Sequence, residues 1–174
     1  VALKDHYPNL LLYVDEAHAL GVRGERGLGL GEELQLLSRI DVLVGTFGKA
    51  LASMGAFVVC SEEIRKVLVN RMRPLIFSTH FPPFQAAWTK YVWENMRSMQ
   101  AERMFLQDLG KKLRSTLADL QGSDLVSKSH IVPYVVGESK AALQKAEALR
   151  ECGFFALAVR PPTVPQGSSR IRFS

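Results

Sequence analysis

Lys49 stands in the stretch "GTFGKALASMGAFVVC" (45–60), among glycines and small apolar residues. An apolar run precedes the lysine and another follows it, so we predict a tight turn between two buried strands. Partial desolvation in such a turn would lower the pKa of the lysine, and its amine could then attack a carbonyl group to form a Schiff base. The alternative is a lysine on an ordinary surface loop.

Asp15 and His18 close an apolar run, "NLLLYVDEAH" (9–18), that is typical of a buried parallel strand whose carboxyl end opens onto a site. The letters "DEAH" also occur in a helicase nucleotide motif. That motif needs an upstream phosphate loop of the form GxxxxGK[ST], which is missing from this sequence. The remaining alternative is a strand-end turn with a hydrogen-bonded histidine.

Taken together, the lysine, the aspartate and a threonine suggest a pyridoxal cofactor. Such a cofactor needs a lysine for its aldehyde, a carboxylate for its pyridinium nitrogen, and hydroxyls or backbone amides for its phosphate. Asp15 is followed after about thirty residues by Thr46, which precedes Lys49 by three positions. These residues supply all three requirements.

Composition narrows the class of protein. The chain has 174 residues, 47% of them hydrophobic and 22% charged, as in a globular protein with a real core. We expect no membrane span, because no apolar run reaches about 18 residues, and no nucleic-acid partner, because the basic residues are scattered. Cys60 and Cys152 have no metal-type spacing, so no metal is expected. Reduced cysteines and the lack of a signal segment favour the cytoplasm.

Strands alternate with helices along the chain, so the predicted fold class is α/β. The expected break in the long helical region is at Gly110 or nearby, and a boundary between two units is placed near residue 100. Strands are predicted at 9–18, 40–47, 55–61 and 129–137, with two more around a proline loop in 154–174. Residues 25–37 are predicted to be a glycine-rich loop that leads into a helix. Further helices are predicted at 61–73 with Ser61 as N-cap, at 83–120 and at 138–153, with 74–83 extended.

Four stretches in this order and spacing resemble the α-oxoamine synthases: "YVDEAHALGVRGERGLG", "GTFGKALASMGAF", "FSTHFPP" and "RPPTVPQGSSRIRF". These are fold-type I PLP enzymes, which condense an amino acid with an acyl thioester and release CO2. The resemblance covers essentially the whole chain. It implies that 1–100 is the C-terminal part of a large PLP-binding domain with a mostly parallel sheet, and that 101–174 is a smaller, incomplete C-terminal α/β domain.

The resemblance assigns the cofactor contacts residue by residue. Lys49 would bind the aldehyde of pyridoxal 5'-phosphate as a Schiff base and then act as the base that removes the α-proton. Asp15 would pair with the pyridinium nitrogen, His18 would hydrogen-bond the phenolic oxygen, and Thr46 would bind the phosphate. The three residues Lys49, His18 and Asp15 are therefore the expected catalytic group.

The resemblance also implies a homodimer with a shared site. Ser78 and Thr79 in "FSTHFPP" resemble a pair that reaches the phosphate bound by the neighbouring subunit. Arg172 resembles the clamp for the carboxylate of the amino acid, where a guanidinium can hold two oxygens. Arg170 shares its strand face, so spacing does not choose between the two, and the family pattern favours Arg172. We expect Arg160 to be surface charge.

Within the family, "RPPTVPQG" before "RIR" most resembles the biotin-pathway member, which joins L-alanine to a pimeloyl thioester. Alternatives are the 2-amino-3-ketobutyrate CoA ligase, 5-aminolevulinate synthase and serine palmitoyltransferase types, and a non-catalytic family member. The acyl carrier, CoA or acyl carrier protein, stays open. In this family a preceding N-terminal half completes the site, so the sequence is expected to be part of a longer protein and not to turn over by itself.

Overall fold

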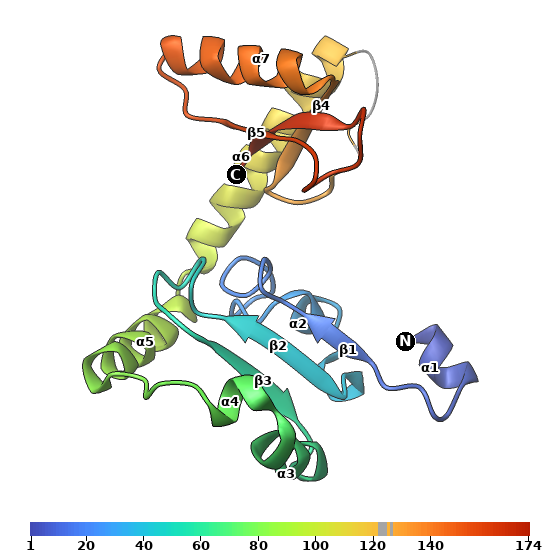
Figure 1. Ribbon diagram of the computed structural model, residues 1–174, viewed down its shortest axis with the longest axis vertical. Helices are drawn as coiled ribbons and strands as arrows, with labels where there is room; N and C mark the ends of the chain where they lie inside the picture. The colour runs from blue at the N-terminus through green and yellow to red at the C-terminus, as the bar shows by residue number, and fades with distance from the viewer. Residues whose placement is uncertain (122–124, 126) are drawn as a thin grey trace. The chain divides into compact units, whose positions relative to one another are not determined.

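The computed structural model describes residues 1–121, 125 and 127–174, which form two compact units, Val1–Arg103 and Met104–Ser174. Figure 1 shows each unit with its own three-stranded sheet. Helix α6 (Gln100–Gln121) contains the boundary between the units. The assignment of 1–100 and 101–174 to a large and a small domain of a longer protein stays a prediction.

The first unit has a mixed sheet with the strand order β1-β2-β3. Strands β1 (Tyr13–Asp15) and β2 (Val42–Thr46) are parallel, whereas β2 and β3 (Ala56–Cys60) are antiparallel. All three lie inside predicted strands. The antiparallel pair follows from the short connection between β2 and β3, because a parallel crossover needs a dozen or more residues.

Helix α3 agrees with the sequence, whereas α1 at the start of the chain was not predicted and the segment near Pro74 differs. Helix α3 begins after Ser61, whose hydroxyl accepts a hydrogen bond from the backbone N–H of Ile64, as predicted for an N-cap. The prediction that 74–83 is extended is wrong at its start, because α4 includes Pro74. Proline fits there since the first helical N–H groups have no partner inside the helix. The helices are α1 (Ala2–His6), α2 (Leu30–Glu33), α3 (Glu62–Arg71), α4 (Arg73–Ile76) and α5 (Pro83–Met96), with a 3-10 turn at Leu37–Arg39.

The helical region breaks between Met96 and Gln100, so the prediction of a break at Gly110 is wrong. Gly110 lies inside α6, where an added Cβ would stand 3.1 Å from the Cα of His130. Such a contact is tighter than side chains normally make with backbone. The glycine therefore permits a close approach between α6 and residue 130.

The second unit has an antiparallel sheet in the order β4-β6-β5, packed against α7. The hydroxyls of Ser139 on α7 and Ser169 on β6 lie 3.1 Å apart, so α7 covers the sheet face that carries Ser169 and Ile171. These elements confirm the strand and helix predictions for this part of the chain. Their bounds are Val132–Gly137 for β4, Ser139–Glu151 for α7, Leu157–Val159 for β5 and Ser169–Phe173 for β6.

The core of the first unit is built around Leu20, Leu51 and Met96, with aromatic rings of β3 and α5 beside them. The strands themselves are less buried than predicted. Tyr13 on β1 is 63% exposed and Val59 on β3 is 58% exposed. Three strands and the helices around them leave part of this sheet uncovered by described residues.

Candidate active site

Asp15 and Thr46 end adjacent parallel strands and therefore lie at the same edge of the sheet. Asp15 pairs in register with Val44, two residues before Thr46. The carboxyl edge of parallel strands is the place where α/β proteins build their sites. His18 lies in the turn that follows β1 and Lys49 in the turn that follows β2, so the structure brings these four predicted residues to one edge of the sheet. Figure 1 shows β1 and β2 side by side.

The turn after β1 orients Asp15. One carboxylate oxygen of Asp15 accepts a hydrogen bond of 2.8 Å from the backbone N–H of Ala17. The carbonyl of Glu16 accepts from the N–H groups of Ala19 and Leu20, at 2.9 and 2.8 Å, and closes one helical turn. His18 sits on this turn and is exposed, as is Asp15. A rigid turn therefore presents both side chains to solvent.

Glu16 is a residue that the sequence analysis did not single out. Its side chain is 2% exposed, and its carboxylate accepts hydrogen bonds from the N–H groups of Leu30, at 3.0 Å, and Gly31, at 2.6 Å. An added Cβ at Gly29 would lie 2.6 Å from the carboxyl carbon of Glu16. Glu16 thus joins the turn beside Asp15 to the glycine-rich loop. In the sequence, its position directly after Asp15 and before the glycine-rich loop was the signal that could have identified it.

Two arginine–glutamate pairs hold the segment 23–26 to α2. Arg23 donates to Glu33 through two nitrogens, with 2.7 Å from Nε, and Arg26 donates to Glu32 at 2.7 Å. The bond from Arg23 holds the pKa of Glu33 below its ordinary 4.5. Burial raises the pKa of Glu32, but Arg26 and two backbone N–H groups outweigh burial, so that pKa is lowered as well.

Lys49 lies in a loop closed by hydrogen bonds at both ends. The N–H of Phe47 donates to the carbonyl of Gly55 and the N–H of Ser53 to the carbonyl of Phe47, both at 2.9 Å. The N–H of Ala52 donates to the carbonyl of Lys49 at 3.0 Å. The side chain of Lys49 is exposed, so the described residues do not supply the desolvation that we predicted.

The lysine loop packs directly on the turn after β1. An added Cβ at Gly21 would lie 2.9 Å from the Cβ of Ala50, the neighbour of Lys49. Leu51, the next residue, is fully buried in the core cluster. Gly21 therefore allows the two loops that carry Lys49 and His18 to touch.

The hydroxyl of Thr46 is already hydrogen-bonded inside the loop. It donates to the carbonyl of Gly55 and accepts from the N–H of Gly48, both at 3.1 Å. To donate to a phosphate oxygen, the hydroxyl would have to rotate away from Gly55. The oxygen of that hydroxyl could still accept from the N–H of Gly48.

The remaining predicted residues are not brought to this edge by any described contact. Ser78 donates to the carbonyl of Leu75 at 3.1 Å, and both Ser78 and Thr79 are exposed in the segment after α4. Arg170 and Arg172 lie in the second unit on the same face of β6, and Arg160 is exposed. The Nε of Arg170 donates to the carbonyl of Ser168 at 3.0 Å, whereas the buried Nε of Arg172 has no described hydrogen-bond partner.

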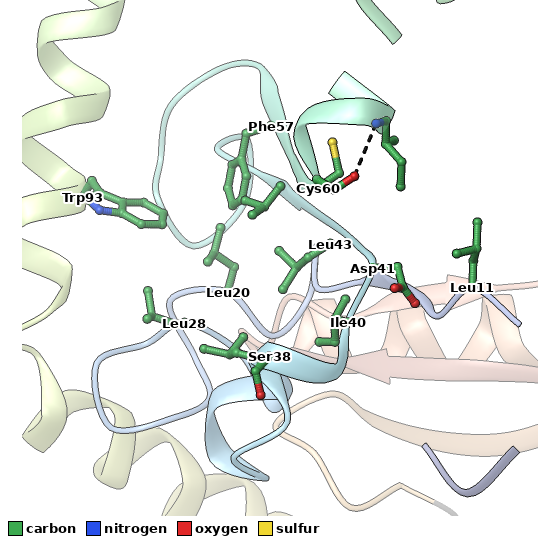
Figure 2. A pocket seen from close by; sticks show the side chains of 14 residues that line it. Leu11, Leu20, Leu28, Ser38, Ile40, Asp41, Leu43, Phe57, Cys60 and Trp93 are labelled. Carbon is green, nitrogen blue, oxygen red and sulfur yellow. Dashed lines mark hydrogen bonds between the residues drawn. The ribbon is translucent and has the colours of Figure 1, made fainter. Parts of the chain in front are cut away.

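The first unit also contains an apolar cavity of about 640 Å³, and the four residues at the sheet edge do not line it. Leu20, Leu43 and Phe57 gather around this cavity in Figure 2, with Trp93 at its border. Its walls are mainly apolar, with Asp41 and Cys60 as the ionisable side chains among the described lining residues. In the described part of the chain, no helix is long and apolar enough for a bilayer, and no three His, Cys, Asp or Glu side chains are grouped to hold a metal ion.

Comparison with known proteins gives a consistent result over the whole chain. The model of the family "Aminotransferase class I and II" matches residues 1–174. A protein of Pasteurella multocida, provisionally named 8-amino-7-oxononanoate synthase, is 53% identical over 174 residues, and one of Haemophilus influenzae with the same provisional name is 51% identical. The match leaves the helicase interpretation of "DEAH" without support.

Solved structures agree with the fold. A serine palmitoyltransferase of Sphingomonas wittichii superposes with a TM-score of 0.88 at 27% identity, covering 99% of this chain and 44% of that one. The 8-amino-7-oxononanoate synthase of Francisella tularensis superposes with a TM-score of 0.81 at 28% identity, covering 99% and 51%. The α/β fold of type I PLP-dependent transferases is thereby confirmed. The chain covers only 45% and 46% of the two curated relatives' lengths.

Proposed function

Because the chain belongs to the aminotransferase class I and II family, we propose that it is part of a PLP-dependent enzyme that condenses L-alanine with a pimeloyl thioester. The products would be 8-amino-7-oxononanoate, CO2 and the free thiol of the acyl carrier, in the synthesis of biotin. The relatives that are 51–53% identical over the entire chain, and their provisional names, support this choice of substrates.

The observation that carries the proposal is the shared sheet edge of Asp15, His18, Thr46 and Lys49. An exposed lysine, an oriented carboxylate, an imidazole and a hydroxyl match the aldehyde, ring nitrogen, phenolic oxygen and phosphate of pyridoxal phosphate. When bound there, the cofactor would supply an electron-accepting ring that makes the α-proton of an amino acid acidic.

The chain's own residues would then bind and move protons. The amine of Lys49 would remove the α-proton of the amino acid and later return a proton. Asp15, held by the N–H of Ala17, would keep its negative charge directed at the ring nitrogen. The guanidinium of Arg172 would bind the carboxylate of alanine, as the family pattern favours.

Several parts of the proposal concern the longer protein. We propose a cytoplasmic homodimer in which Ser78 and Thr79 reach the phosphate of the partner's cofactor. The thioester is carried by CoA or by acyl carrier protein. A second candidate uses serine in place of alanine, because serine palmitoyltransferases superpose with the higher TM-scores. The 2-amino-3-ketobutyrate CoA ligase and 5-aminolevulinate synthase types and a non-catalytic member are further alternatives.

Reductive trapping tests the cofactor. The protein, in its longest natural form, is mixed with PLP, reduced with borohydride, digested, and searched by mass spectrometry for pyridoxyl-labelled peptides. We expect the label on Lys49, and its loss in Lys49→Ala but not in Lys66→Ala, which removes an exposed helix lysine. Label spread evenly over surface lysines would refute PLP as the cofactor. A spectral change of the PLP-loaded enzyme with serine or glycine but not with alanine would refute only the biotin-pathway assignment.

A further inference from the structure

Helix α5 contacts the lysine loop through a ring of three hydrogen bonds. The side-chain amide of Gln85 donates to the hydroxyl of Ser53 at 2.7 Å, and the hydroxyls of Ser53 and Thr89 lie 2.6 Å apart. The hydroxyl of Thr89 donates to the backbone carbonyl of Gln85 at 2.8 Å. Ser53 belongs to the lysine loop, whereas Gln85 and Thr89 lie more than thirty residues later on α5.

The proton count of this ring has one solution. Each hydroxyl has one proton to donate, and Thr89 donates its proton to Gln85, so Ser53 must donate to Thr89. Every member then donates once and accepts once. Thr89 is 8% exposed, and a buried hydroxyl that lost its partner would pay its full desolvation cost. The ring therefore fixes Ser53 at one position on the helix.

A second bond from the same helix holds the preceding residue. The indole N–H of Trp88 donates to the carbonyl of Ala52 at 2.9 Å. Ala52 has a φ of +45°, a left-handed conformation that costs energy for a residue with a side chain. The helix thus holds a strained residue in place, three positions after Lys49.

We propose that Ser53, Gln85 and Thr89 are positioning residues for Lys49, an inference that rests on the proposed function. Leu51 packs in the core and Ser53 is hydrogen-bonded to α5. The loop that carries Lys49 is therefore held in place two and four residues after the lysine. The hydrogen-bonded ring acts through the loop and touches neither substrate nor cofactor. It limits where the lysine amine can reach, which favours reaction at one point of the sheet edge.

The central variant is Thr89→Val, which keeps the shape of the side chain and removes its hydroxyl. Thr89→Ser restores the hydroxyl, and Ser53→Ala breaks the ring from the loop side should Thr89→Val fail to fold. Thr116→Val is the matched control, because Thr116 makes the same bond to the carbonyl four residues earlier, on the exposed surface of α6.

Two readouts are measured in the longest natural form of the protein. The first is amide hydrogen exchange of Ala52 and Ser53, which does not depend on PLP. We expect roughly tenfold faster exchange in Thr89→Val and Ser53→Ala, and no change in Thr89→Ser or Thr116→Val. The second is the share of pyridoxyl label on Lys49 relative to Lys66, which we expect to fall by roughly threefold or more in the same two variants only.

The outcomes separate this inference from the proposed function. Faster exchange with an unchanged label on Lys49 would overturn the positioning role, and so would unchanged exchange. Absence of label on Lys49 in the wild type would overturn the proposed function and with it this inference, while the exchange data would still report the hydrogen-bonded ring. Loss of both properties in Thr89→Val with recovery in Thr89→Ser would support the positioning role.

Discussion

The carboxylate of Glu16 lies 2.6 Å from the backbone nitrogen of Gly31. It accepts hydrogen bonds from the N–H groups of Leu30 and Gly31, which follow Glu16 by 14 and 15 residues. This contact joins the turn that presents Asp15 and His18 to the start of α2. A buried carboxylate that accepts two backbone N–H bonds fixes both segments, because breaking these bonds would leave the carboxylate buried without a partner.

We predict that Glu16→Gln destabilises the protein by about 1–3 kcal/mol, because a side-chain NH2 group would face a buried backbone N–H. Chemical denaturation would measure the change. Glu94→Gln is the control, since the side chain of Glu94 is 62% exposed and its nearest cation is 3.9 Å away. Equal denaturation midpoints for the two variants would show that the Glu16 contacts contribute nothing.

The pairing of Arg23 with Glu33 predicts a loss of stability in acid. The bond from Arg23 lowers the pKa of Glu33 in the folded protein below its ordinary 4.5. Glu33 therefore binds a proton less tightly in the folded state than in the unfolded state. The resulting stabilisation is complete above the ordinary pKa and is lost as the pH falls through the lower folded value. We expect the free energy of unfolding to decline below about pH 4.5. The decline should be smaller in Arg23→Gln, because Glu33 has lost the partner that lowers its pKa.

Unfolding by urea at a series of pH values would measure this decline. Lys111→Gln is the control, because it removes one positive charge from the exposed surface of α6. The same pH profile in Arg23→Gln and in the wild type would contradict the role of the ion pair.

Gly110 predicts an exception to helix propensity. Alanine normally stabilises a helix interior by up to about 1 kcal/mol relative to glycine. At Gly110 the added Cβ would stand 3.1 Å from the Cα of His130 and 3.2 Å from an Arg114 nitrogen, so we expect Gly110→Ala to be destabilising by roughly 1 kcal/mol. Thermal unfolding measures the sign, with Ser115→Ala on the exposed surface as the comparison. A higher midpoint for Gly110→Ala would mean that the backbone at 130 yields easily.

Arg172 and Arg170 differ in the hydrogen bonds that their Nε atoms make. Because Arg170 donates from Nε to Ser168 and the family pattern favours Arg172, we expect Arg172 to bind the amino-acid carboxylate. Arg172→Lys should raise the KM for the amino acid about tenfold or more, since a lysine cannot form the two parallel bonds. Arg170→Lys should raise it less. Steady-state kinetics of the longest natural form would measure both, and a larger effect at Arg170 would reverse the assignment.

Much of the local structure could be predicted from the sequence. Apolar runs bounded by glycine and charged residues predicted the strands, and Ser61 before two glutamates predicted the start of α3, because these signals act between neighbours. Where a local signal has a second physical meaning, prediction failed. Gly110 indicated a helix break, but it lies inside α6 and permits a close contact with residue 130. Pro74 indicated an extended chain, although proline also fits the start of a helix.

Sequence alone also determined the kinds of residue available for chemistry: Lys49, Asp15, His18 and Thr46, at spacings that suit a pyridoxal cofactor. Only the tertiary structure decided what holds them. The bonds of Glu16 to the glycine-rich loop and of Ser53 to α5 join residues that are 14 to 36 positions apart. Hydrophobic periodicity reports which side of an element is buried, but it carries no information on which distant partner meets it, and that pairing arises when the elements pack.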